Sequence, residues 1–447
     1  MVVGAILWIL VAKQLAHRIH FSMPLDFQVY RDAAKSLVHG GDTYDQRFTF
    51  AHLSFTYPPA ALIVFGALTF APVATGVSLW WILTSLALMA VVYLAVRTST
   101  DLSPTSSMAL ALVLSGASAL LLEPVRSNFD FGQINVFLML LVALDTFVVG
   151  GRSRGVLVGV ATAIKLTPLI YVMYYVLERK RSSVIRSVGT MVVITTIAWL
   201  ALPRDSLLYW LHQAFSPGHK GDASVPANQS WYGLIDHFSG SLGVWTLPLW
   251  VGADFVTFAV GCYLVGRYLG QNRRVEAVVT LALCELLMSP ISWTHHWSWI
   301  VLLPVVIVAR WGRDWWVSSA MLAVLIVAVV APYHSHPYRW YLHGVREQIM
   351  GSSLLLSGAV LLGTLAIVEM LRHRRDHTLV RDAHPLLTPS SDIGEVRHEL
   401  NAFLLTDPES GVSEDAQTLV RSLIPLSKRA GGAARSRRRE RTVRATP

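Results

Sequence analysis

The feature that most constrains this chain is a series of long apolar runs separated by short polar segments. Of its 447 residues, 53% are hydrophobic and only 15% are charged, against roughly 25% charged in soluble domains. The runs are uniformly apolar, whereas the lipid-facing strands of a membrane barrel would alternate, so the pattern predicts helices. We therefore expect an all-α polytopic membrane protein with about twelve transmembrane helices, several of them shorter than the ~20 residues of a perpendicular span. The runs lie at 2–17, 57–71, 76–96, 106–122, 134–149, 155–177, 188–202, 245–266, 276–289, 297–309, 317–331 and 352–371.

The distribution of positive charge predicts how the chain is oriented. The formal net charge of +9 does not indicate a nucleic-acid partner, because the basic residues lie in short loops and in the tail, where the positive-inside rule places them. Four basic clusters are predicted to be cytoplasmic: 179–186, 267–274, 310–313 and the tail after Arg372. The long loops 18–56, 203–244 and 332–351 then lie outside.

The run at 155–177 does not fit a simple count of spans. Its preceding loop carries Arg152 and Arg154 and is predicted to be cytoplasmic, yet only one run separates it from the basic cluster at 179–186. One solution is a helical hairpin or broken helix, interrupted at Lys165-Leu-Thr-Pro168, since proline breaks helices. The other solution leaves 150–154 outside and makes 123–133 cytoplasmic. We favour the first.

The composition changes near His373 and divides the chain into two regions. Residues 1–371 are predicted to form the transmembrane domain, with 18–56 as its first outer loop. Residues 372–447 are rich in Asp, Glu, Ser, Pro and Arg and are predicted to be a cytoplasmic, mostly disordered basic tail. Contact of this tail with anionic lipid headgroups is the alternative to simple solvation.

The first outer loop presents a carboxylate at the membrane surface. From Phe27 to Val38 the apolar residues recur at helical spacing, which predicts an interfacial amphipathic helix with Asp26 at its N-cap. Asp26 has two interpretations, a helix cap alone or a general base. Asp32 and Asp42 are weaker candidates, more typical of solvated or turn positions.

Two further segments place polar groups where lipid would disfavour them. The segment from Glu123 to Asn135 mixes amides, Arg126 and acids with aromatic residues, which suits a sugar pocket, although a plain connecting loop tolerates the same composition. Lys165 lies inside an apolar run, too far from either end to reach the interface. Its natural partner is a phosphate, and the alternative is a buried acid.

Tandem histidines are the sharpest local signal. The segment Ser289-Pro-Ile-Ser-Trp-Thr-His-His-Trp297 lies between apolar runs. A metal site is disfavoured, because His295 and His296 diverge by about 100° on a helix and no ligand set is completed nearby. A tryptophan belt would explain the Trp residues but not the histidines, so contact with phosphate or sugar is preferred. His334, His336 and His343 are less specific. Asn228-Gln-Ser230 is either a glycosylation sequon or a second amide cluster in an outer loop.

Taken together, these motifs resemble glycosyltransferase family 87 over about residues 1–371. The resemblance implies a GT-C fold, a polyprenyl-phosphate-mannose donor, and a glycolipid acceptor at the outer face of the plasma membrane. The family's acid in the first outer loop is carried over to Asp26, and its tandem histidines to His295 and His296. The segments that carry the resemblance are 25–30, 55–59, 123–135, 165–168, 228–231 and 289–297.

The function expected on this basis is an inverting α-(1→2)-mannosyltransferase that acts on phosphatidylinositol mannosides or on lipomannan and lipoarabinomannan. Asp26 would take the acceptor proton, and the leaving phosphate would need cations and hydrogen-bond donors in place of a general acid. No metal or other cofactor is expected. Donor-phosphate and sugar contacts are assigned to Tyr57, Arg126, Gln133, Asn135, Lys165, Asn228, Gln229, His295 and His296.

Two rival functions remain open from the sequence. Within the class, an arabinofuranosyltransferase using polyprenyl-phosphate-arabinose would share these motifs. From another class, a transporter of lipid-linked glycans would show an inverted repeat with matched broken helices, whereas only 155–177 looks broken.

Overall fold

The computed structural model describes residues 1–18, 23–38, 43–214, 225–237, 242–311, 314–331 and 345–383. The candidates Asp42, His334, His336 and His343, and the tail from residue 384 onward, lie outside these residues. The chain divides into two units, Met1–Ala366 and Ile367–Pro447, and the site described below lies entirely within the first.

Within the described residues the secondary structure is helical, apart from two isolated bridges, Phe48–Leu53 and Asn228–Trp293. This confirms the predicted all-α class for that part of the chain. The helices are α1 Val2–Arg18, α2 Leu25–Val38, α3 Pro59–Phe65, α4 Val73–Ser99, α5 Pro104–Leu121, α6 Glu123–Phe131, α7 Asn135–Ala143, α8 Val156–Ile164, α9 Val172–Leu177, α10 Arg181–Ala201, α11 Pro203–Leu208, α12 Trp231–His237, α14 Thr246–Gly270, α15 Arg274–Met288, α16 Leu303–Val306, α17 Trp315–Val330, α18 Val345–Gly351 and α19 Ser353–Ala383. Short 3-10 or π segments extend several of them, including Gly66–Thr69, Leu144–Val148, Thr167–Tyr171 and Thr294–Leu302.

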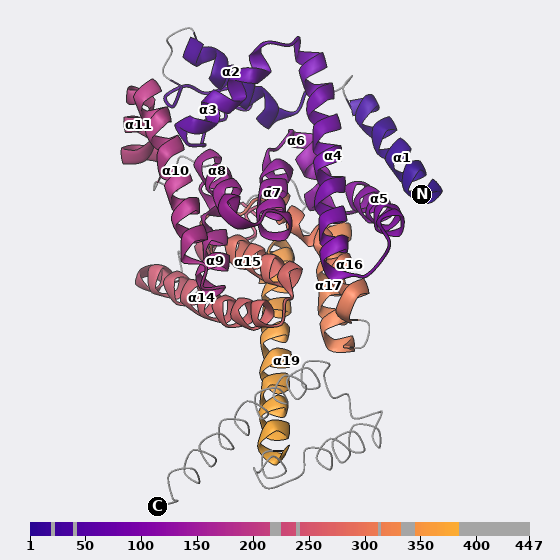
Figure 1. Cartoon of the computed structure of the whole chain (residues 1–447). Coiled ribbons are helices and arrows are strands. Elements are labelled where there is room, and N and C mark those ends of the chain that lie inside the picture. The colour runs from indigo at the N-terminus through magenta and orange to yellow at the C-terminus, as the bar shows by residue number, and fades with distance from the viewer. Residues whose placement is uncertain are drawn as a thin grey trace, which may run out of the picture. The chain divides into compact units, whose positions relative to one another are not determined.

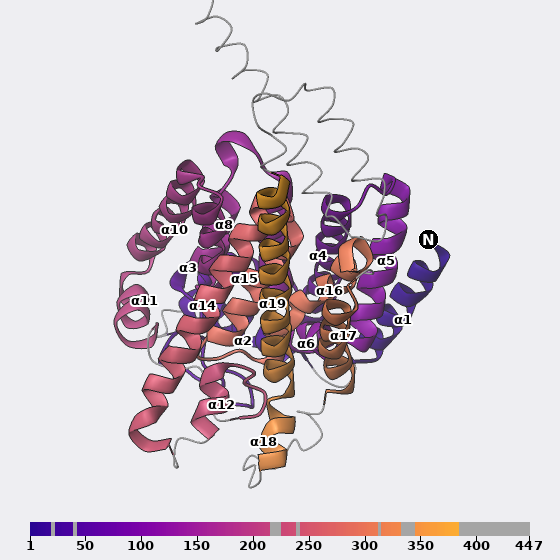
Figure 2. The ribbon, with the colours of Figure 1, turned by 90° about the horizontal axis from the view of Figure 1, so that it is seen from below.

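Five helical stretches in the described residues are long and apolar enough to cross a membrane, which makes the chain a multi-pass membrane protein. They are Val73–Ser99, Pro104–Leu121, Arg181–Ala201, Gly243–Gly270 and Ser353–Arg375. Chain neighbours among the helices, such as α4 with α5 and α14 with α15, lie side by side (Figure 2). The predicted first outer loop, 18–56, contains α2, which packs against α3 of the following run at one end of the bundle (Figure 1).

Two other predicted runs adjoin or contain a break. The run at 134–149 forms the helical stretch Asn135–Val148, and a bend of 116° separates this stretch from α6 before it. The bend occurs at Gly132, whose φ of +67° ends α6 in the left-handed region that glycine adopts readily. The run at 57–71 is divided into two short elements. Helix α3 begins at Pro59, and a 3-10 segment replaces it from Gly66.

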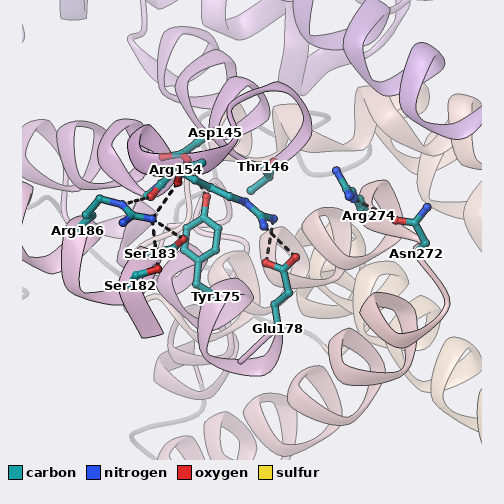
Figure 3. Close-up of polar contacts among 12 residues, drawn as sticks. Asp145, Thr146, Arg154, Tyr175, Glu178, Ser182, Ser183, Arg186, Asn272 and Arg274 are labelled. Carbon is teal, nitrogen blue, oxygen red and sulfur yellow. Dashed lines mark hydrogen bonds and ion pairs between the residues drawn. The ribbon is translucent and has the colours of Figure 1, made fainter. Parts of the chain in front are cut away.

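The run at 155–177 is a hairpin whose two ends meet. The Arg154 guanidinium pairs with the Glu178 carboxylate at 2.9 Å, and Arg186 Nε donates to the Arg154 carbonyl at 2.7 Å (Figure 3). Helix α8 ends at Ile164, and the chain turns through an extended Lys165 and the 3-10 segment Thr167–Tyr171 into α9. The structure therefore has the favoured hairpin, and segments 150–154 and 178–186 lie at the same end of it.

A buried carboxylate holds the base of this hairpin together. Asp145 accepts hydrogen bonds from the backbone N–H groups of Gly155 at 2.6 Å and Val158 at 2.7 Å, and from the Tyr175 hydroxyl at 2.9 Å (Figure 3). Its charge thus caps the start of α8 and ties α9 to it. These hydrogen bonds at the base of the hairpin hold α8 and α9 together and thereby support the tip, which carries Lys165.

Candidate active site

A cavity of about 970 Å³ lies where α2 and the segment before α3 meet the hairpin tip and the histidine segment. Its walls come from α2, from the segment before α3, from the turn between α6 and α7, from the hairpin tip and from residues 289–296. Segments far apart in sequence therefore converge on one space. The predicted site residues that line it are Asp26, Tyr57, Gln133, Lys165, His295 and His296.

Asp26 lies in the first turn of α2 and bonds across the cavity. The prediction that it is the N-cap is wrong, because α2 begins at Leu25, one residue earlier. Gln133 Nε2 donates to Asp26 Oδ2 at 2.5 Å. Gln133 reaches this position because Gly132 reverses the chain, and a Cβ at Gly132 would lie 2.8 Å from the Phe27 Cβ.

Two tyrosines fix the orientation of the Gln133 amide. Gln133 Oε1 accepts from the hydroxyls of Tyr30 at 3.0 Å and Tyr57 at 3.1 Å, and these hydroxyls lie 2.8 Å apart. With its oxygen held by the tyrosines, the amide must turn its N–H toward Asp26. The carboxylate is therefore oriented by a network whose members are all buried or half-buried.

The surroundings of Asp26 raise its pKa toward neutral pH. Burial raises the pKa of Asp26 from 3.8 to about 6, while the Gln133 hydrogen bond and the positive charge of Lys165 act to lower it. A carboxylate with this pKa is mostly ionised at pH 7 yet is a stronger base than an exposed aspartate. These are the properties of a general base that works near neutral pH.

Lys165 projects from the hairpin tip and contacts neutral polar groups. Its Nζ donates to Asn135 Oδ1 at 2.8 Å, lies 3.1 Å from His296 Nε2, and sits 5.5 Å from the centroid of the Tyr57 ring. Because an ammonium can only donate, His296 Nε2 must accept, which leaves that imidazole neutral with its proton on Nδ1. The charge of Lys165 also acts on the carboxylates of Asp26 and Glu285.

The backbone of the histidine segment is held by amides from α6 and α7. The His295 carbonyl accepts from Asn128 Nδ2 at 2.8 Å and from Asn135 Nδ2 at 3.3 Å. The His295 ring packs at 5.5 Å from the Phe131 ring and 4.8 Å from the His296 ring. Held by these contacts, both imidazoles line the cavity.

The Asn228 side chain positions the histidine segment, the Gln229 side chain bonds to the start of α19, and neither lines the cavity. Asn228 Oδ1 accepts from the Ser292 N–H at 2.8 Å, and Asn228 Nδ2 donates to the Pro290 carbonyl at 3.1 Å. Gln229 Oε1 accepts from the N–H groups of Leu354 and Leu355, each at 3.1 Å. Since Asn228 is only 2% exposed, the sequon interpretation is ruled out.

Two other predicted residues line separate spaces. Asn135 lines a small pocket behind Lys165 and His296, which also includes Glu285. Arg126 lines a second cavity on another face of α6, together with Arg18 and Asp130. The structure thus separates Arg126, Asn228 and Gln229 from Asp26.

Three residues of this site were missed from the sequence. Tyr30 and Asn128 orient other groups, and nothing in their spacing marks them. Glu285 did carry a signal, because it is an acid within the apolar run 276–289, and intramembrane acids are rare. In the residues that the structure describes, no three His, Cys, Asp or Glu side chains cluster as a metal site.

The chain combines a helical membrane fold with a cavity that a buried carboxylate, Asp26, and a cation, Lys165, both line. The model of glycosyltransferase family 87 matches residues 55–290. This chain belongs to that family, and it is accordingly a membrane glycosyltransferase of the hexosyltransferase type.

Characterised relatives agree with this assignment. The chain is 30% identical over 414 residues to a polyprenol-phosphate-mannose-dependent alpha-(1-2)-phosphatidylinositol mannoside mannosyltransferase of Mycolicibacterium smegmatis, covering 85% of this chain and 90% of the relative. It is 35% identical over 296 residues to a polyprenol-phosphate-mannose-dependent alpha-(1-2)-phosphatidylinositol pentamannoside mannosyltransferase of Mycobacterium tuberculosis, covering 65% and 67%. It is 25% identical to an alpha-(1->3)-arabinofuranosyltransferase of Corynebacterium glutamicum, covering 56% and 58%. No solved structure matches the chain.

Proposed function

We propose that this protein transfers mannose from polyprenyl-phosphate-mannose to a mannose hydroxyl of phosphatidylinositol mannosides or of lipomannan and lipoarabinomannan, forming an α-(1→2) linkage. The proposal rests on one observation above all: Asp26, Lys165 and His296 line the same cavity. The printed names of the mannosyltransferase relatives, which match over most of the chain, support the choice of donor and acceptor.

The chemistry follows from the charges at the site. Asp26 takes the proton of the acceptor hydroxyl as the hydroxyl oxygen bonds to the anomeric carbon of mannose. The bond from that carbon to the phosphate oxygen breaks, and its electron pair stays with the polyprenyl phosphate. A β-linked donor gives an α-linked product by this single displacement.

The leaving phosphate is stabilised by groups that already carry protons and charge. Lys165 supplies the positive charge, and His295 and His296 supply neutral imidazoles beside it. Preorganised groups of this kind stabilise developing negative charge without reorganising during the reaction. A phosphate leaving group has a low pKa, so the reaction needs no general acid. Sugar hydroxyls would contact the amide and phenol of Gln133 and Tyr57 at the same wall.

The proposal extends to the whole chain. Residues 1–371 would form a GT-C domain with about twelve transmembrane helices in the plasma membrane, with the cavity at the extracytoplasmic face. Residues 372–447 would form the cytoplasmic basic tail. The basic segments 150–154 and 178–186 on one side of the hairpin support this orientation.

A donor assay tests the proposal. Purified protein in lipid vesicles is given a phosphatidylinositol mannoside acceptor with radiolabelled polyprenyl-phosphate-mannose or polyprenyl-phosphate-arabinose. We expect label from the mannose donor alone in an α-(1→2)-linked product. Transfer of arabinose, for which the Corynebacterium relative is the precedent, or transfer of neither sugar would contradict the proposal.

A further inference from the structure

A second cavity of about 570 Å³ lies on another face of α6, between the end of α1 and the end of α17. Its polar wall is formed by Arg18, Glu123, Arg126, Ser127 and Asp130. Its apolar wall is formed by Phe131 and residues 329–331. A space with two guanidinium groups on one side and aliphatic side chains on the other suits an anionic headgroup attached to a lipid chain.

The charges of this second cavity leave one guanidinium for a ligand. Arg18 forms an ion pair with Asp130, and Glu123 accepts a hydrogen bond from Thr294 Oγ1 at 3.1 Å. Arg126 is half-buried and, in the part of the chain that the structure describes, forms no hydrogen bond or ion pair, although its charge acts on Asp130. A half-buried arginine that faces a cavity in this way is an anion-binding group.

The two cavities share a wall. Phe131 lines both of them, and its ring also packs against His295 of the first cavity. The hydrogen bond between Thr294 and Glu123 joins a residue of the first cavity to a residue of the second. The two cavities therefore adjoin each other across Phe131.

We infer that the second cavity binds the phosphodiester of the glycolipid acceptor through Arg126. This inference rests on the proposed function. The donor phosphate is bonded directly to the reacting carbon, so it must lie in the first cavity with Asp26 and Lys165. The acceptor phosphodiester is separated from the reacting hydroxyl by inositol and mannose rings, so it belongs in a neighbouring space. Arg126 is thereby reassigned from the donor to the acceptor.

Acceptors with and without phosphate test this assignment. Initial rates are measured for the wild type, Arg126→Gln and Arg126→Lys with a phosphatidylinositol mannoside and with an alkyl mannoside that carries the same terminal sugars. For Arg126→Gln we expect the KM for the glycolipid to rise about 10-fold or more, since a charge-assisted contact is lost, with no change in the donor KM. Kinetics with the alkyl mannoside should stay unchanged, which also shows that the variant is folded. The glycolipid KM of Arg126→Lys should lie between those of the wild type and Arg126→Gln.

Arg97→Gln is the matched control, because Arg97 is exposed at the end of α4 and bonds only to the nearby Leu102 carbonyl among the described contacts. Its kinetics should equal those of the wild type. A rise in the donor KM with both acceptors would overturn the inference and return Arg126 to the donor. An unchanged glycolipid KM, or an equal loss with both acceptors, would also overturn it. A wild type inactive with both acceptors would instead refute the proposed function.

Discussion

At the scale of single residues, we expect the pKa of the proposed base, Asp26, to set the pH range of the enzyme. The protonated carboxyl cannot accept the proton of the acceptor hydroxyl, and burial raises its pKa to about 6. We therefore expect kcat/KM for the acceptor to fall about tenfold per unit below pH 6 and to level off above it. A pH–rate profile in detergent measures this directly, and a rate that stays constant down to pH 4.5 would exclude Asp26 as the base.

The hydrogen bond from Gln133 provides a second test of the same residue. It stabilises the ionised form of Asp26 and lowers the pKa of that carboxyl. In Gln133→Ala this effect is lost, so the pKa should rise and the acidic limb of the profile should move to higher pH. An acidic limb at the same pH as in the wild type would mean that another group titrates.

Lys165 should matter most for use of the donor. Lys165→Met removes the only charge that we assign to the leaving phosphate, and we expect kcat/KM for the donor to fall roughly 100-fold. Lys180→Met is the control, because Lys180 is an exposed lysine at the base of the same hairpin. Equal kinetics for the two variants would remove Lys165 from the mechanism.

At the scale of elements, the bend between α6 and α7 presents Gln133 to Asp26. Gly132→Ala puts a Cβ into a left-handed residue, which costs about 1–2 kcal/mol, and directs it at Phe27. We expect lower thermal stability and a lower transfer rate. Gly150→Ala should change neither, because a Cβ there meets nothing within 4 Å. Thermal unfolding and initial rates of both variants give the comparison, and identical behaviour would contradict the role of the bend.

The elements also explain what could be predicted from sequence. The break near Lys165 follows from local chemistry, because Pro168 and an intramembrane cation mark it. The roles of Asn228 and Arg126 do not follow from local chemistry, because they depend on tertiary contacts. Asn228 bonds to residues more than sixty positions away, and Arg126 lies on a helix that the sequence suggested as a loop. Arg126 lies on α6, whereas Gln133 follows the left-handed Gly132 beyond the end of that helix, so the two residues line different cavities.

At the scale of the whole molecule, the closed hairpin predicts that the segments at its two ends lie on the same side of the membrane. Ser153 and Ser182 are exposed near the paired Arg154 and Glu178. In a background without Cys262 and Cys284, we expect Ser153→Cys and Ser182→Cys to be labelled by a membrane-impermeant thiol reagent from the same side. Phe50→Cys, at a residue that is 83% exposed in the first outer loop, should be labelled from the other side. Labelling of Ser153→Cys and Ser182→Cys from opposite sides would contradict the hairpin.

The convergence of the first outer loop, the hairpin tip and the histidine segment is tested most directly by the rate of mannosyl transfer in Asp26→Asn vesicles. The substitution keeps the size of the side chain and removes its basicity, so we expect the rate to fall by about 10²–10⁴-fold. The Asp32→Asn protein, altered on the same helix, should keep the wild-type rate. An Asp26→Asn protein that transfers mannose at a near-normal rate would contradict the account.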